Sequence, residues 1–256
     1  MPVTFIDDVE NTVFDHDVGR NGTFQLFIDP PTDTFEIIPE VAVNEATFII
    51  RVKDPLLLDY EMQTEVNFTI IAKEVESPGK WSAAHVQVFI VDQNDNYPEF
   101  TQSVYNVTIP ENSEVGSFIT QIKAYDKDSD DFGTMGIRYK NLRGSIAHLL
   151  TLDPVVGTLS IKSTNSEAFD REIVSRYYLT VEAIDNNGLG NRNTAQIIID
   201  LEDVNDNAPI FLQHQYEANL LENKDDFENP LILEARDLDL EDTENSQITY
   251  EIIDGI

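Results

Sequence analysis

The feature that most constrains the fold of this chain is an internal repeat with one constant period, roughly the length of an ordinary domain. Acidic residues recur at this spacing in six places, with no insertion between them. Because self-similarity at a fixed period is the signature of repeated structural units, the sequence predicts a tandem array. The six pairs are Asp92 and Asp203, Glu111 and Glu222, Asp126 and Asp237, Asp59 and Asp170, Asp15 and Asp126, and Glu74 and Asp185.

Apolar residues repeat in phase with the acidic ones. Leu179, Val181 and Ala183 alternate with other residues in "YYLTVEAID", and "NFTIIAKE" has the same alternation one period earlier. Alternation with period two in β-branched and aromatic runs is typical of half-buried strands. Several such strands in each unit, without a long helical pattern, predict an all-β fold, a sandwich of two antiparallel sheets.

The repeat also predicts the domain boundaries. We expect a first unit at residues 1–98, a complete second unit at 99–209 and the beginning of a third at 210–256. The counterpart of Glu111 would fall at position zero, so the first unit is expected to lack its first strand or to begin irregularly. The spacing matches Asp15 and Asp17 with Asp126 and Asp128. With a longer loop Asp8 and Glu10 could take those places instead, and this alternative stays open.

The charge balance excludes several classes of partner. The chain has 48 acidic and 16 basic residues, a formal net charge of −32, and it has no cysteine. Such a surface repels phosphate backbones and anionic lipids, so neither nucleic acid nor direct membrane contact is expected. With 41% hydrophobic residues the chain can still form cores. We expect it to be part of a larger protein.

The acidic residues gather in segments that a sandwich would place in loops at its two ends. Surface charge for solubility alone would not keep one register across repeats. Since carboxylates in close proximity repel strongly, a cation is expected among them. Calcium fits best, because it takes six to eight oxygen ligands, whereas zinc prefers histidine or cysteine. An EF-hand loop beginning at Asp126 is excluded, because Asp131 replaces its glycine and Ile137 its final glutamate.

Five motifs occur in the order found in one known family. "DQNDNYP" and "DVNDNAP" end successive units, and "PEN", "FDRE", "YDKD" and "EAID" lie between them. In these motifs the sequence resembles the extracellular repeats of cadherins over essentially its whole length. The resemblance implies immunoglobulin-like Greek-key β-sandwiches with calcium at the junctions between them. Trp81 is the only tryptophan and is not N-terminal, so we expect a long atypical cadherin that does not swap strands.

The resemblance also implies the calcium ligands. "DYE" at 59–61 departs from "DRE" but keeps both carboxylates, while Glu74 stands where the family has an aspartate. Neither junction is complete within the chain. For the first junction the implied ligands are Asp59, Glu61, Asp92, Asn94, Asp95, Asp126, Asp128 and Asp185, with the carbonyls of Gln93 and Asn96. For the second they are Glu111, Asp170, Glu172, Asp203, Asn205, Asp206, Asp237 and Asp239, with the carbonyls of Val204 and Asn207.

The implied function is calcium-dependent cell adhesion by the extracellular part of a plasma-membrane protein. The implied partner is another cadherin, of the same or a different kind, bound through parts that lie in or outside this chain. The sequons at Asn21, Asn67 and Asn106 are compatible with an extracellular glycoprotein. No catalytic motif is present, so an enzyme is not expected. The alternatives are a passive spacer, a receptor segment for a toxin or pathogen, and a calcium-binding module of a secreted enzyme.

Overall fold

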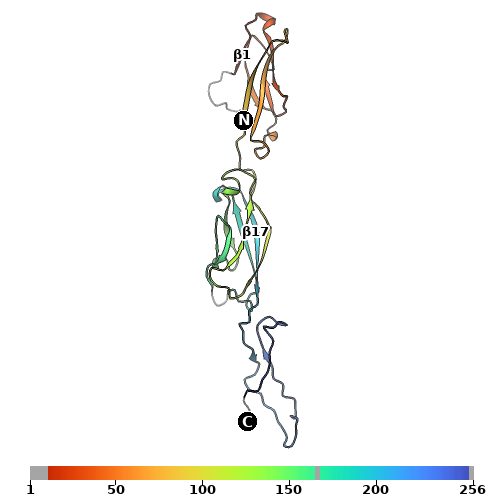
Figure 1. The fold of residues 1–256 in the computed structure, drawn as a ribbon, viewed down its shortest axis with the longest axis vertical. Helices are drawn as coiled ribbons and strands as arrows, with labels where there is room; N and C mark the ends of the chain where they lie inside the picture. The colour runs from red at the N-terminus through yellow and green to blue at the C-terminus, as the bar shows by residue number, and fades with distance from the viewer. Residues whose placement is uncertain (1–10, 165–167, 254–256) are drawn as a thin grey trace. The chain divides into compact units, whose positions relative to one another are not determined.

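The computed structural model describes residues 11–164 and 168–253, which belong to two compact units that divide between Gln93 and Asn94 (Figure 1). The described residues contain strands and short 3-10 helices but no α-helix. None of them forms a helix of the length and apolar character that crossing a membrane requires. The all-β prediction is confirmed. The predicted repeat boundaries at residues 98 and 209 stay predictions.

The first unit packs a six-stranded sheet, in the order β1-β5-β4-β2-β7-β8, against the two-stranded sheet β3-β6. Its core includes Phe24 and Leu26 on β2, Phe68 and Ile70 on β7, and Phe35 on β3. Two 3-10 helices, Gly19–Gly22 and Pro55–Leu57, lie in its loops. The strands are β1 (Thr12–Phe14), β2 (Thr23–Asp29), β3 (Phe35–Ile38), β4 (Val41–Val43), β5 (Glu45–Thr47), β6 (Ile49–Val52), β7 (Glu65–Glu74) and β8 (Trp81–Phe89).

The second unit pairs the sheet β10-β17-β16-β13 with the sheet β11-β15-β14, and two further strand pairs, β9-β12 and β18-β19, lie near its ends. Its 3-10 helices are Thr134–Gly136, Ala147–Leu149 and Asn186–Gly188. The strands are β9 (Glu99–Phe100), β10 (Val104–Pro110), β11 (Phe118–Gln121), β12 (Ala124–Tyr125), β13 (Arg138–Arg143), β14 (Leu150–Leu152), β15 (Thr158–Ile161), β16 (Arg176–Ile184), β17 (Arg192–Glu202), β18 (Ile210–Phe211) and β19 (Ala235–Arg236).

The alternating apolar residues form the core of the second unit, as the sequence predicts. Leu179 and Val181 on β16 are fully buried, and so are Ile197 and Ile199 on the adjacent strand β17. They pack against Leu159 on β15 of the other sheet. Each such side chain contributes about 1.5–3 kcal/mol through burial.

One strand pair differs from the antiparallel prediction. β10 runs parallel to β17, with Val104 opposite Gln196 and Pro110 opposite Glu202. A parallel pair needs a long crossover connection, and here the remaining strands of the sandwich supply it. The alternation of side chains does not distinguish a parallel from an antiparallel neighbour, so the sequence pattern could not reveal this pair.

The period of the sequence repeat reappears in the strand pairing. Phe100 on β9 lies opposite Ala124 on β12, and the same register holds one period later between Phe211 on β18 and Ala235 on β19. We call residues 210–253, which contain this later pair, the C-terminal segment. The pair β18-β19 thus repeats the pair β9-β12, with which the preceding sandwich begins.

Candidate metal centres

The "D-x-D" sequences that begin at Asp15, Asp126 and Asp237 form the same turn. The first aspartate accepts a hydrogen bond from the backbone N–H of the second, which fixes both carboxylates on one side of the loop. The recurrence supports the match of Asp15 and Asp17 with the later pairs; the alternative residues Asp8 and Glu10 lie outside the described residues. The distances are 2.9 Å from Asp17 N to Asp15 Oδ1, 3.1 Å from Asp128 N to Asp126 Oδ1, and 3.1 Å from Asp239 N to Asp237 Oδ1.

Three carboxylates converge at the end of the second unit's sandwich where β10 and β17 finish. One oxygen each of Glu111, Asp170 and Glu172 lies within 4.8 Å of the other two. Glu111 is 2% exposed, and its two oxygens accept hydrogen bonds from the backbone N–H groups of Arg171 and Val204, both at 2.8 Å. The buried glutamate therefore ties the "DRE" turn to the segment that follows β17.

A second group of carboxylates shares Glu172 with the first. One oxygen each of Glu172, Asp203 and Asp239 lies within 4.8 Å of the others, although Asp239 comes from the C-terminal segment. Arg171 Nη1 lies 3.4 Å from Glu172 Oε1 and 3.2 Å from Asp203 Oδ1. The two groups thus form one continuous acidic seam between the sandwich and the C-terminal segment.

Asparagine side chains hold the "DVNDN" segment in this seam. Asn207 donates to Asp239 Oδ1 from its backbone N at 3.2 Å and from its Nδ2 at 2.9 Å. Asn112 of the "PEN" sequence donates to Asp206. Both hydrogen bonds from Asn207 reach the same oxygen of Asp239, so its Oδ2 stays available for a different ligand.

Proximity and burial perturb the ionisation of Glu172. Burial of its carboxyl is the main cause, and the neighbouring Glu111 adds to it, so that the pKa of Glu172 rises from 4.5 to about 7. So high a pKa means that the surroundings disfavour the ionised form of the carboxyl. An added cation would stabilise that form.

An analogous arrangement lies at the other end of this sandwich, where β16 ends. Asn94 Nδ2 donates to Asp185 Oδ1 at 2.7 Å, and Asn96 Nδ2 donates to Asp128 Oδ1 at 2.6 Å. Asn191 Nδ2 donates to the backbone carbonyl of Asn96 at 2.7 Å. Asn96 and Asp128 are related by the period of the repeat to Asn207 and Asp239, whose contact is the same.

Unpartnered oxygens show what these clusters lack. The Oδ2 atoms of Asp126, Asp185 and Asp239 are buried without a hydrogen-bond partner. Burial is the main reason that the pKa values of Asp126 and Asp185 lie above their usual range. Buried carboxylate oxygens without partners are costly. Here they lie beside further carboxylate and amide oxygens, and such oxygens are the donors that a hard divalent cation prefers. The residues therefore fit a calcium ion.

Comparisons with known proteins find similarity to cadherins. The cadherin domain family matches residues 105–202. The chain is 41% identical to Cadherin-86C of Drosophila melanogaster over 254 residues, which are 99% of this chain and 13% of that protein. It is 37% identical to human Cadherin-related family member 2 over 98% of this chain and 18% of that protein. The structure of repeats EC22-24 of mouse Cadherin-23 superimposes with a TM-score of 0.67 at 31% identity, covering 91% of this chain and 70% of that one.

The chain belongs to the cadherin superfamily. Cadherin domains are extracellular and typically bind calcium, and the members of the family are adhesion proteins and not enzymes. The prediction that the chain is not an enzyme is thereby confirmed. The chain spans less than a fifth of the length of the two curated cadherins named above.

The first unit contributes predicted ligands from the end where β7 begins and β8 finishes, since Glu65 lies opposite Phe89. Asp59 Oδ1 accepts a hydrogen bond from Met62 N at 3.2 Å. Glu61 follows in the same turn, and Asp92 lies just beyond β8. Gln93 Nε2 donates to the carbonyl of Asp92 at 2.8 Å.

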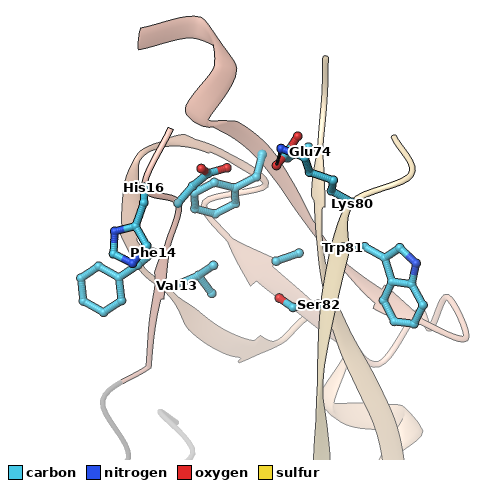
Figure 2. Close-up of a pocket in the computed structure, with 10 residues that line it drawn as sticks. Val13, Phe14, His16, Glu74, Lys80, Trp81 and Ser82 are labelled. Atoms are coloured by element: carbon cyan, nitrogen blue, oxygen red, sulfur yellow. Dashed lines mark ion pairs between the residues drawn. The ribbon is translucent and has the colours of Figure 1, made fainter. Parts of the chain in front are cut away.

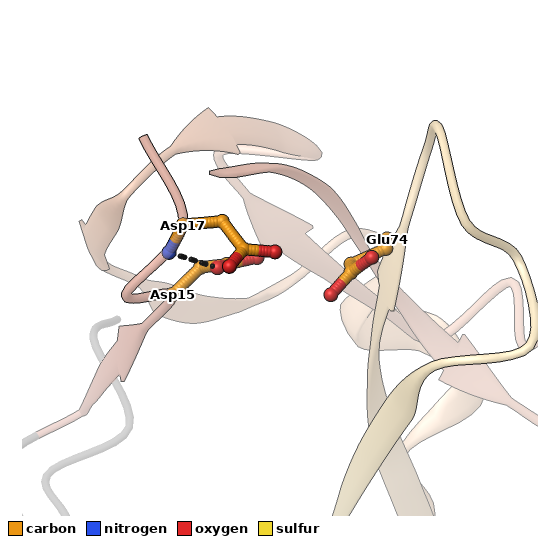
Figure 3. A group of neighbouring side chains, drawn as sticks. All are labelled: Asp15, Asp17 and Glu74. Atoms are coloured by element: carbon orange, nitrogen blue, oxygen red, sulfur yellow. Dashed lines mark hydrogen bonds between the residues drawn. The ribbon is translucent and has the colours of Figure 1, made fainter. Parts of the chain in front are cut away.

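The opposite end of the first unit carries a third acidic group. Asp15, Asp17 and Glu74 each place an oxygen within 4.8 Å of the others, and Figure 3 shows Glu74 facing the Asp15–Asp17 turn. The basic residue at this group is a lysine, whereas the second group is contacted by Arg171. Lys80 Nζ lies 3.1 Å from Glu74 Oε1 (Figure 2). The same atom lies 3.3 Å from Asp17 Oδ2.

Sequence reasoning missed four residues of the cadherin junctions. Asn112 and Asn191 hold linker residues, and Asn245 Nδ2 donates to Asp203 Oδ2 at 2.8 Å. Gly190 lies against Asp185, so close that a Cβ atom would fall 1.9 Å from Asp185 Oδ1. Asn112 stands inside the quoted "PEN" motif and could have been found there. The other three lie outside the motifs.

Proposed function

We propose that this chain is a segment of a calcium-dependent adhesion ectodomain, and that calcium bound in its acidic seams stiffens the array. The observation that carries the proposal is Asp239. Its side chain comes from the C-terminal segment, is 1% exposed, and lies within 4.8 Å of Glu172 and Asp203 of the preceding sandwich. Its Oδ2 has no hydrogen-bond partner.

The residues proposed to hold calcium at the second junction include the five carboxylates of this seam. Bound calcium supplies the positive charge that carboxylates from two neighbouring segments can share. The ligands are Glu111, Asp170, Glu172, Asp203, Asn205, Asp206, Asp237 and Asp239, with the carbonyls of Val204 and Asn207.

The repeat extends the proposal to the first junction on sequence grounds. Asn96 donates to Asp128 as Asn207 donates to Asp239, and Asp128 N donates to Asp126 as Asp239 N donates to Asp237, which supports the extension. Asp185, a further ligand proposed there, accepts a hydrogen bond from Asn94. The remaining ligands proposed there are Asp59, Glu61, Asp92, Asn94 and Asp95, with the carbonyls of Gln93 and Asn96.

The electrostatics of the seam explain why stiffness would depend on a cation. Two like charges 4.8 Å apart repel by about 3.5 kcal/mol at an effective dielectric constant of ~20. Glu172, Asp203 and Asp239 form three such pairs, and Arg171 offsets only part of this repulsion. Without a cation the seam favours separation of the C-terminal segment from the sandwich, so the chain bends there.

Small-angle X-ray scattering of the chain, with calcium and with chelator, tests this mechanism. Asp206→Ala removes a proposed ligand that lies in the linker, while Asp226→Ala removes the same charge from an exposed position. We expect Asp206→Ala to broaden the distance distribution in calcium towards that of the chelated protein, and Asp226→Ala to leave it unchanged. Coincident profiles of wild type and Asp206→Ala in calcium would refute the proposal.

The proposed partner is another cadherin, and the proposed location is outside the cell on a plasma-membrane protein. A passive spacer would show the same calcium-dependent stiffness but no adhesion. Aggregation of beads coated with the full ectodomain separates the two functions. Beads that aggregate in calcium and disperse in chelator support adhesion, whereas beads that never aggregate favour a spacer or a receptor for another ligand.

A further inference from the structure

We infer that the acidic group of Asp15, Asp17 and Glu74 is neutralised by the ammonium group of Lys80, so that this end of the first unit does not take a divalent cation as its counterparts do. The group has the repeat position, the turn and the carboxylates that the cadherin family leads one to expect of a calcium site. The residues around it do not fit that ion.

The position of the lysine in the repeat is the first reason. Lys80 stands one full period before Asn191, whose neutral amide donates to the linker carbonyl of Asn96 at 2.7 Å. The substitution therefore replaces a group that organises cation ligands with a group that is itself a cation. An ammonium group only donates hydrogen bonds and cannot coordinate a metal ion.

The contacts of the lysine are the second reason. Its Nζ lies 3.1 Å from Glu74 Oε1 and 3.3 Å from Asp17 Oδ2, so one ammonium bridges two of the three carboxylates. Hydrogen bonding to Glu74, and then to Asp17, raises the pKa of Lys80 above its usual value. The lysine is therefore charged at physiological pH and repels a second cation from the same oxygens.

The state of the carboxylate oxygens is the third reason. In the second unit Asp126 and Asp185 keep buried Oδ2 atoms without partners, whereas among the described residues no oxygen of Asp15, Asp17 or Glu74 is left so. The longer side chain of Glu74, which replaces the aspartate of the other repeat, contacts Lys80 while it faces the turn (Figure 2).

Trp81 provides a local probe. It is the only tryptophan of the chain and lines the same pocket as Asp15, Glu74 and Lys80. Terbium is a luminescent substitute for calcium that tryptophan sensitises at short range. Asp92 lies beyond the far end of β8, roughly 35 Å along the strand direction from Trp81, so the first unit's other predicted ligands do not contribute.

The test compares the wild-type chain with Lys80→Asn, which restores the residue found in the second repeat. Terbium is titrated while tryptophan is excited selectively. We expect Lys80→Asn to bind terbium at this site at least about tenfold more tightly than wild type, because the competing charge is gone. Lys53→Asn is the matched control, since Lys53 pairs with Asp33 on the exposed surface of the same unit and should change nothing.

The inference is overturned if the terbium affinities of wild type and Lys80→Asn differ by less than about threefold. It is overturned equally if neither protein shows tryptophan-sensitised terbium luminescence. Circular dichroism verifies that each variant is folded, and Lys80→Asp, which adds a fourth carboxylate, verifies that Trp81 sensitises terbium bound at this group. The inference builds on the proposed calcium function but is tested separately from it. Scattering of the Asp206→Ala variant reports on the second junction, and tryptophan-sensitised luminescence reports on the first unit alone.

Discussion

Replacing Asp239 by asparagine should stabilise the chain in chelator and reduce the further stability that calcium supplies. Asp239 Oδ1 accepts two hydrogen bonds from Asn207, and an asparagine can keep both. Its Oδ2 is buried without a partner, and the new NH2 group at that place can donate to Asp203 or Glu172, whose oxygens lie nearby. The substitution therefore removes a charge while keeping shape and hydrogen bonding.

The expected gain in chelator follows from the geometry. Asp239 forms two like-charge pairs within 4.8 Å, each worth about 3.5 kcal/mol at an effective dielectric constant of ~20. The ion pairs of Arg171 reach Glu172 and Asp203 and, among the described residues, do not include Asp239. Because Glu172 has a pKa of about 7, it is partly protonated at neutral pH, and the gain should lie between about 3.5 and 7 kcal/mol.

In calcium the advantage of the variant should shrink. Loss of a charged ligand weakens calcium binding, and each tenfold loss of affinity removes about 1.4 kcal/mol of stabilisation by the ion. Differential scanning calorimetry in chelator and in saturating calcium measures both effects. We expect Asp239→Asn to unfold at a higher temperature than wild type in chelator and to gain less from calcium. A variant that is destabilised equally in both conditions would refute the reasoning.

Asp200→Asn provides the control for this experiment. Asp200 lies on β17 and pairs with Arg176 at a half-exposed position. Since exposed ion pairs contribute about 0–1 kcal/mol, its loss should lower stability slightly and by the same amount with and without calcium.

Two further predictions concern pH and packing. The folded-state pKa of Glu172 lies above its unfolded value, so the metal-free protein should lose up to about 3 kcal/mol as the pH rises from 4.5 to about 7. Chelated Glu172→Gln should lack this part of the pH dependence of thermal unfolding, and an unchanged profile would contradict the assignment. Gly190→Ala should displace Asp185, because a Cβ atom would lie 1.9 Å from Asp185 Oδ1. Isothermal titration with calcium should then show at least one weakened site, and wild-type affinities at every site would contradict the prediction.

Much of this architecture could be predicted because the repeat links residues that are far apart in the chain. Asp126 and Asp237 begin the same turn, in which the Oδ1 of each accepts a hydrogen bond of 3.1 Å from the backbone N–H two residues later. The register of β9 with β12 likewise recurs between β18 and β19. A single period that holds for both acidic and apolar residues constrains the fold far more than composition does, since the two patterns have independent physical causes.

Other features could not be read from the sequence. The parallel pairing of β10 with β17 depends on which edge the strand meets, and alternation carries no information about that. Asn191 and Asn245 act through single hydrogen bonds that form only when distant loops meet. Gly190 lies in a turn where many residues would suit the backbone, and only the proximity of Asp185 restricts it.

Lys80 shows how a repeat can be misread when only its carboxylates are compared. Asp15, Asp17 and Glu74 keep the acidic positions of the later cluster, with a glutamate in place of the aspartate Asp185. The structure places an ammonium group 3.1 and 3.3 Å from two of the three residues. A site for a cation is defined by its total charge as much as by its ligands. Cation content should therefore be assigned for each end of a cadherin repeat by counting every charge within hydrogen-bonding distance, basic residues included.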